Sequence, residues 1–222
     1  MNHSIEIGQH KIELEEKEPF VYHGSIDALQ FVCRRWNWGQ KNLAQDMAIR
    51  YHKPSQKYYT DTISYNENML RSTIVSLVCD GKKLEMDALD ARKGDFLLDV
   101  CLWVNQQKSP ELAQSLVKTP QDSLFVVENA SLSAEFRPWT WGAKMNSVKS
   151  SSVYNPEAQD MQLLNGRFSE LLLLNTLKRL RIQGQEISIS LQSIQNLPGD
   201  IADALVEFSV EINLVPETQK KT

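Results

Sequence analysis

The chain has 222 residues, of which 41% are hydrophobic and 23% are charged, and its formal net charge is −4. A chain of this length forms one large domain or two small ones, and its apolar fraction suffices for a core, which excludes wholesale disorder. Because Lys and Arg do not outnumber Asp and Glu, we do not expect the basic surface of a nucleic-acid-binding protein.

The cysteines and the apolar runs bear on location. Residues 1–4 are polar and open no apolar signal segment, so no secretory leader is expected. The longest apolar run, residues 171–174, is far shorter than the roughly 20 residues that span a membrane. Cys33, Cys79 and Cys101 lie far apart in apolar surroundings and form no CxxC pair. This pattern is typical of buried thiols in a reducing compartment, and we expect a cytoplasmic protein without membrane insertion.

The first half of the chain begins with a β-rich stretch and continues into helices. Short apolar runs beside a turn dipeptide favour a hairpin, and apolar residues at helical spacing favour helices. The predicted elements are, in order, a hairpin over residues 20–35 that turns at His23-Gly24, the W-x-W-G segment at 36–39, and helices over 40–51, 65–78 and 96–104. A proline loop precedes the second of these helices, and Gly81 ends it.

The second half repeats this order. The predicted elements are a hairpin over residues 124–137 that turns at Glu128-Asn129, the W-x-W-G segment at 139–142, and helices over 143–153, 168–180 and 201–208. Pro198 is expected to open the last helix, because proline is favoured near a first helical turn. Acidic residues follow at this point, Asp200 and Asp203 here and Asp95 and Asp99 in the first half, and we expect them to complement the helix dipole.

The two halves are also related in sequence. Residues 34–41 and 137–144 both read R-x-W-x-W-G-x-K, 103 residues apart. At this offset 12 of 48 positions from Arg34 to Gly81 are identical, where chance would give about three. We therefore predict an α+β fold built as a tandem duplication of a unit of about 103 residues, with pseudo-twofold symmetry.

The predicted domain boundaries follow from the duplication. The first repeat is residues 1–107, a polar linker with a short helix is residues 108–122, the second repeat is residues 123–215, and residues 216–222 are a loose tail. Proline residues within the linker mark it as a connection.

The Trp pairs are the candidate partner-binding residues. The set comprises both Trp residues and the following Lys of each copy: Trp36, Trp38, Lys41, Trp139, Trp141 and Lys144. Exposed Trp is enriched at the centres of protein interfaces. The alternative is that the Trp residues pack in the core, which would explain their presence in both copies without any ligand.

An enzyme, or an enzyme's partner subunit, is the alternative to a binding protein. Its catalytic residues would be His23, Cys33, Asp46 or His52, all in the first half. No hydrolase motif surrounds them, and the sequence has neither a phosphate-binding glycine motif nor metal-ligand spacing. We therefore expect no enzymatic activity, no catalytic residue, no metal site and no cofactor.

The repeated motifs resemble those of a known group of proteins. The matching residues are Arg137, Trp139, Trp141, Gly142, Lys144, 170–174 and 197–200 in the second copy, and Trp36, Trp38, Gly39, Lys41, Glu67, Met69, Leu70 and 94–95 in the first, which lacks the Leu-Pro. The pattern resembles that of small tail-assembly and baseplate-hub proteins of T4-like phages and related contractile injection systems. The resemblance implies a non-enzymatic structural or assembly role with protein partners; it assigns no oligomeric state.

Overall fold

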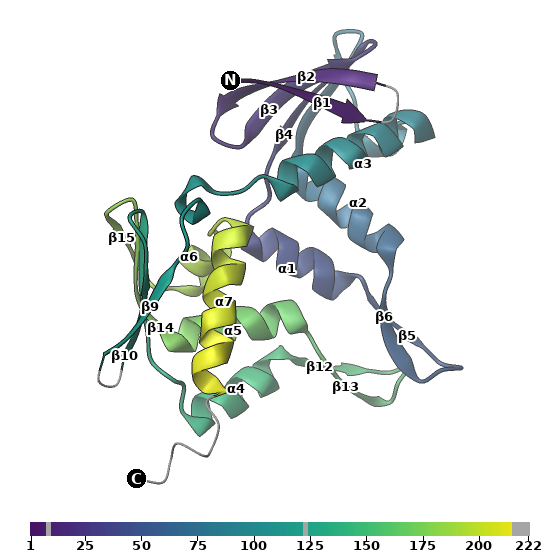
Figure 1. Cartoon of the computed structure of the whole chain (residues 1–222). Helices are drawn as coiled ribbons and strands as arrows, with labels where there is room; N and C mark the ends of the chain where they lie inside the picture. Colours follow the sequence, from purple (N-terminus) through teal and green to yellow (C-terminus); the bar gives the residue numbers. More distant parts are fainter. Residues whose placement is uncertain (8–9, 122–123, 215–222) are drawn as a thin grey trace, which may run out of the picture. The chain divides into compact units, whose positions relative to one another are not determined.

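The computed structural model describes residues 1–7, 10–121 and 124–214, and the fold is mixed α+β as expected (Figure 1). The chain divides into two compact units. Unit 1 comprises residues 1–36 and 61–107, and unit 2 comprises residues 37–60 and those from 108 onward. Residues 37–60 thus belong with the second half of the sequence rather than with their neighbours, which the predicted boundaries did not anticipate.

Unit 1 contains a six-stranded antiparallel sheet. Its strands, in spatial order, are β1 (Asn2–Ile7), β2 (His10–Glu18), β3 (Val21–Ile26), β4 (Leu29–Arg34), β7 (Ile74–Cys79) and β8 (Lys82–Lys83). Burial alternates along β4, where Leu29, Phe31 and Cys33 point into the core. The helices α2 (Thr62–Thr73) and α3 (Ala91–Gln106) and the 3₁₀ turn η1 (Met86–Ala88) complete the unit.

The first hairpin turns later than predicted. His23 and Gly24 lie inside β3, and the turn comes after Ile26, at Asp27, whose φ is +51°. A Cβ on Gly24 would lie 2.5 Å from the ring of Phe31. Gly24 therefore permits close packing over the sheet instead of forming a turn.

Both of the strongest predicted helices end earlier than expected, and each is followed at once by a strand. In unit 1, residues 74–79 form β7 instead of continuing α2, and in unit 2 the helix α5 (Asn165–Thr176) gives way to β14 (Leu177–Ile182). β-branched residues at the start of β7 favour an extended backbone, and pairing with β4 supplies the partner strand. The prediction of helix over these residues was wrong.

Unit 2 has a five-stranded sheet, two isolated hairpins and five helices among the described residues. The sheet order is β15 (Gln185–Ile187), β14, β11 (Leu132–Phe136), β10 (Leu124–Glu128) and β9 (Val117–Gln121). The hairpins are β5 (Ile49–His52) with β6 (Lys57–Thr60), and β12 (Ser152–Asn155) with β13 (Asp160–Leu163). The helices are α1 (Trp38–Met47), α4 (Trp141–Ser151), α5, α6 (Leu191–Gln195) and α7 (Gly199–Asn213).

Residues 108–121 of the predicted linker are part of the unit 2 structure. Residues 110–112 form a 3₁₀ turn (η2, Pro110–Leu112), and β9 pairs with β10 as the edge strand of the sheet. Ser109 is buried and binds both carboxylate oxygens of Asp200, through its backbone N–H at 2.6 Å and its hydroxyl at 2.7 Å. The predicted tail, residues 216–222, lies outside the described residues.

The starts of the last helices differ between the halves. In unit 1, α3 begins at Ala91 with Asp90 as its N-cap, so Asp95 lies one turn into the helix and not at its start. In unit 2, α7 begins at Gly199 and carries Asp200 in its first turn, as predicted. Within the described residues, no helix is long and apolar enough to cross a membrane.

Candidate functional site

The first W-x-W-G-x-K motif anchors α1 in unit 2. Trp38 is 1% exposed and donates its indole N–H to Asp203 of α7 at 3.0 Å. Lys41 pairs with the other oxygen of the same carboxylate. The backbone N–H of Trp38 also donates to the carbonyl of Leu197 at 2.9 Å. Asp203 was predicted to complement the helix dipole. In the structure its carboxylate binds both Trp38 and Lys41.

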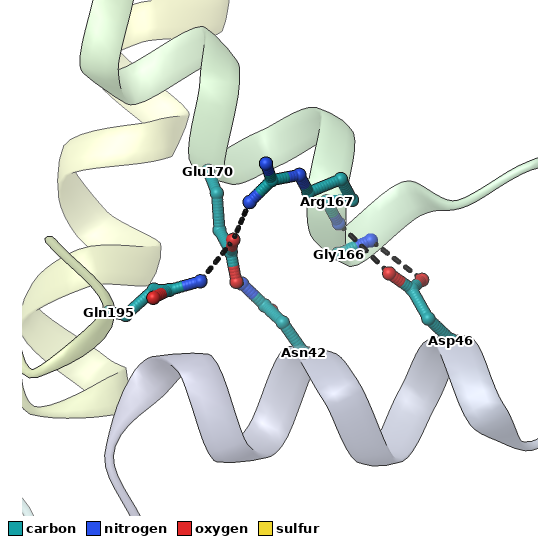
Figure 2. A network of polar contacts seen from close by, with 6 residues as sticks. All are labelled: Asn42, Asp46, Gly166, Arg167, Glu170 and Gln195. Atoms are coloured by element: carbon teal, nitrogen blue, oxygen red, sulfur yellow. Dashed lines mark hydrogen bonds and ion pairs between the residues drawn. The ribbon is translucent and has the colours of Figure 1, made fainter. Parts of the chain in front are cut away.

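A second contact joins α1 to the N-terminus of α5 (Figure 2). The carboxylate of Asp46 accepts the backbone N–H groups of Gly166 and Arg167, each at 2.9 Å. The residue at the N-cap of α5, Leu164, has no side chain that can accept a hydrogen bond. Asp46 therefore supplies the capping acceptor, and its negative charge complements the positive end of the helix dipole.

The polar network continues through a buried carboxylate. Glu170 is 4% exposed and accepts hydrogen bonds from Gln195 at 2.8 Å and from Asn42 at 3.3 Å, and it pairs with Arg167 at 3.3 Å. Buried charges are costly unless paired and hydrogen-bonded, and these partners meet that requirement. The network connects α1, α5 and α6, as Figure 2 shows.

Close approach of α1 to α5 depends on a glycine. A Cβ on Gly166 would lie 2.7 Å from the Cβ of Asn42 and 2.8 Å from its carbonyl oxygen, both closer than real Cβ contacts. Any larger side chain at this position would push the helices apart and lengthen the Asp46 contacts.

An open hollow of about 600 Å³ lies beside this network. It is lined by residues of α1, α5 and α6 together with Ser150 and Leu164, and the exposed side chains of Leu43 and Met47 form part of its rim. The carboxylates nearest to it, Asp46 and Glu170, are already occupied by hydrogen bonds within the chain. The site therefore functions as a helix-docking contact in this structure.

The second W-x-W-G-x-K motif lies in a different environment. Trp141 occupies the position that corresponds to Trp38, yet it is 72% exposed. Lys144, which corresponds to Lys41, lies with its Nζ 5.7 Å from the centre of the Trp141 ring and has an exposed side chain. Of the predicted partner-binding residues, Trp141 and Lys144 are therefore presented to solvent, on α4.

The first Trp of each motif packs inside its own unit. Trp36 is 6% exposed and meets Tyr65 edge-on at 5.9 Å. Trp139 is half-buried and meets Phe168 edge-on at 5.8 Å. For Trp36 and Trp38 the structure favours the alternative interpretation, core packing, because their rings are covered by the chain itself.

Exposed apolar side chains occur on α4 and on the β12–β13 hairpin that follows it in sequence. Trp141 and Met145 lie one turn apart on the helix, and Tyr154, Met161 and Leu163 share one face of the β12–β13 hairpin. All five side chains are at least 37% exposed. We refer to these five residues, with Lys144 and Lys149 of α4, as the α4 surface.

Of the residues of the enzyme alternative, His23 and Cys33 belong to unit 1, and Asp46 and His52 belong to unit 2. Cys33 is buried, its thiol donates to the carbonyl of Tyr22 at 3.6 Å, and burial raises its pKa from 9.0 to about 12. Burial therefore disfavours the thiolate, which is the form in which a cysteine acts as a nucleophile. His23 lies in β3 of unit 1, whereas His52 lies in unit 2, with Nδ1 2.8 Å from the hydroxyl of Ser55.

In the part of the chain that the structure describes, no group of three or more His, Cys, Asp or Glu side chains could hold a metal ion. Asp46, the remaining residue of the enzyme alternative, caps α5. The α4 surface presents an indole ring, ammonium groups and apolar side chains.

Comparison with protein families, with curated proteins and with solved structures finds no match to this chain.

Proposed function

We propose that the chain is a non-enzymatic structural or assembly protein that binds protein partners through two pseudo-equivalent modules, formed by tandem duplication. The order helix, hairpin, helix, strand occurs twice, from α1 to β7 and from α4 to β14. Left-handed backbone at Gln56, Asp80 and Gly81 has counterparts 103 residues later, at Gln159, Gln183 and Gly184. These equivalences support the duplication that the sequence predicts.

Side-chain contacts support the same proposal. The edge-on pairs Trp36–Tyr65 and Trp139–Phe168 are 103 residues apart at both members. The backbone N–H of Trp36 donates to the side chain of Asn105 near the end of α3, and that of Trp139 donates to Asn213 at the end of α7. Both units thus join the motif to the end of their last helix in the same manner.

The observation that carries the binding role is the exposure of the α4 surface. Large apolar side chains that are exposed on neighbouring elements often mark an interaction site. Trp, Tyr and Met are enriched at the centres of such interfaces, and two Lys residues add charge that a partner's carboxylates can match. Trp141 has the size and the exposure of an interface anchor.

The resemblance of the motifs to those of tail-assembly and baseplate-hub proteins supports the setting we propose. In that setting the chain is a component or an assembly factor of a contractile phage tail or injection system, built from a cytoplasmic pool. Its partners are then other proteins of the assembly, without nucleic acid, cofactor or membrane insertion.

Co-purification tests this proposal. The tagged chain is expressed in the organism that encodes it, and the captured proteins are identified by mass spectrometry. We expect tail or injection-system components with the unaltered chain and their loss with Trp141→Ala. The control is Val75→Ala, since Val75 is an exposed apolar residue of unit 1 outside the α4 surface. Capture that lacks such components, or that is unchanged by Trp141→Ala, would contradict the proposal.

A further inference from the structure

The helices α1 and α4 carry the same motif but expose different faces. One face is buried in both helices. It carries Ala44 and Ala48 in the α1 segment and the corresponding Ser147 and Ser151 in α4. The stripe of Trp38, Asn42 and Asp46 on α1 contacts α5 and α7. The corresponding stripe of α4 is Trp141, Met145 and Lys149, and all three side chains are exposed. Thus α4 has one packed face and one exposed face where α1 has two packed faces.

The surface that receives α1 also has a counterpart in unit 1. If the halves are copies, α2 corresponds to α5, and Ile63 and Glu67 correspond to Gly166 and Glu170. Ile63 is 79% exposed, and the side chain of Glu67 is 58% exposed. The counterpart of the α1-binding surface is therefore accessible, with an apolar residue at the helix start and a carboxylate one turn later.

The contacting positions change together between the two pairs of surfaces. Asn42 lies against Gly166. The corresponding residues are Met145 on α4 and Ile63 on α2, so two apolar side chains take the place of a polar side chain and a glycine. Asp46 caps a helix that lacks its own capping side chain, whereas α2 is capped by Asp61 and the counterpart of Asp46 is Lys149. Thus the basic Lys149 takes the place of the acidic Asp46, and the helix that would face it, α2, carries its own capping carboxylate, Asp61.

Charge complementarity points to the same pairing. The helix α4 carries Lys144 and Lys149 and no acidic residue. Residues 61–99, which include α2 and the first turns of α3, carry eight acidic and five basic residues, for a net charge of −3. In the contact made by α1, Lys41 pairs with Asp203 on α7, and the corresponding turns of α3 present exposed Asp95 and Asp99. Opposite charges on facing surfaces favour association and fix its orientation.

We propose that α4 docks on the α2–α3 face of a second copy of this chain, in the manner in which α1 docks on α5 and α7. This inference rests on the tandem duplication proposed above, and it makes a second copy of this chain one of the partners of the α4 surface. The first repeat donates its helix to the second, so the second repeat donates its helix to the repeat that follows. In a chain of two repeats that repeat belongs to another copy. The contact is heterologous, and copies join head to tail into a ring or a filament.

Site-directed disulfide cross-linking tests this contact. A Cβ on Gly166 would lie 2.7 Å from that of Asn42. The corresponding positions, Met145 and Ile63, carry larger side chains that hold the helices farther apart, so we expect the pair Met145→Cys and Ile63→Cys to reach the Cβ separation of about 3.5–4.5 Å that a disulfide needs. Each substitution is introduced singly into chains of different tag length. The background is Cys79→Ser, because Cys33 and Cys101 are buried.

The proposal predicts a cross-linked dimer of one chain of each kind in the mixture, and none with either variant alone. A chain that carries both substitutions should give a ladder of multimers. Met145→Cys mixed with Val75→Cys is the control and should give no dimer. A dimer of Met145→Cys with itself, a link within one chain, or no link in the mixture would overturn the proposal. In each of these cases capture of host proteins through Trp141 can still succeed, so failure here is distinguishable from failure of the proposed function.

Discussion

Asp46 accepts the backbone N–H of Gly166 at 2.9 Å, across 120 residues of chain. This hydrogen bond ties α1, the first helix of the first half, to α5 of the second half. It gives a structural reason why residues 37–60 belong to unit 2. Stability should therefore depend on this contact as well as on the two cores.

Removing the Asp46 carboxylate should destabilise unit 2. We expect Asp46→Ala to lower the free energy of unfolding by about 0.5–2 kcal/mol, because the N-terminus of α5 loses its capping acceptor. Asp46→Asn should retain most of the stability, since Asn is an equally good cap. Urea unfolding followed by circular dichroism measures both, with Gln45→Ala on the exposed face as control. Equal stability of Asp46→Ala and the unaltered chain would show that the capping contact is not significant.

Glycine substitutions separate steric from conformational effects. Gly166→Ala should destabilise by roughly 1–3 kcal/mol, because the new methyl group overlaps Asn42. Gly94→Ala in α3 is the matched control: nothing lies within 4 Å of its Cβ position, so it should stabilise by about 0.5–1 kcal/mol through helix propensity. Thermal unfolding of both variants checks this, and a stabilising Gly166→Ala would rule out the close approach of α1 and α5.

Substitution of the two Trp residues at the same motif position should change stability to very different extents. Trp38→Ala removes a buried ring and leaves Asp203 without its indole donor, and we expect a loss of about 3–5 kcal/mol. Trp141→Ala alters an exposed side chain, and its effect on monomer stability should stay within about 0.5 kcal/mol. Unfolding is measured at low protein concentration, where association is absent. Comparable losses in the two variants would contradict the assignment of Trp141 to the surface.

Burial of Cys33 predicts a pH dependence on the alkaline side. Its pKa is 9.0 when unperturbed and about 12 in the folded chain, because burial disfavours the thiolate. A group with a raised folded pKa stabilises the fold fully below its unfolded pKa, and this contribution is lost as the pH rises from about 9 towards 12. Tyr22, whose pKa burial also raises to about 12, acts in the same direction. The melting temperature should therefore fall above pH 9, less steeply in Cys33→Ala, and parallel curves for the two proteins would refute the assignment.

Much of the local structure follows from sequence pattern, because it depends on neighbouring residues. The α+β class, the β-rich start of each half and the positions of the last helices were predicted. The ends of α2 and α5 were not, because the strands that follow them form only through pairing with β4 and β11. Similarly, Gly24 is a turn residue by composition but lies in a strand because Phe31 and Leu14 cover it.

The site could be predicted only in part. The repeated motif identified Trp38, Lys41, Trp141 and Lys144, but it could not show which copy is buried. That difference is set by contacts with Asp203 and α5, more than 100 residues away from α1. Glu170 has one sequence signal, its identity with Glu67, whereas nothing in the sequence singles out Gln195 as its partner.

The central claim, that α4 docks on a second copy as α1 docks within the chain, is tested most directly by molar mass from light scattering over a concentration series. The unaltered chain should rise above the 25.4 kDa of one copy as concentration increases. Met145→Glu should remain at one copy, because it would face Glu67 and Ile63 of the neighbour. The double variant Met145→Glu with Glu67→Lys should recover the higher mass through the restored charge pair. A mass of one copy for the unaltered chain at every concentration, or no recovery in the double variant, would contradict the claim.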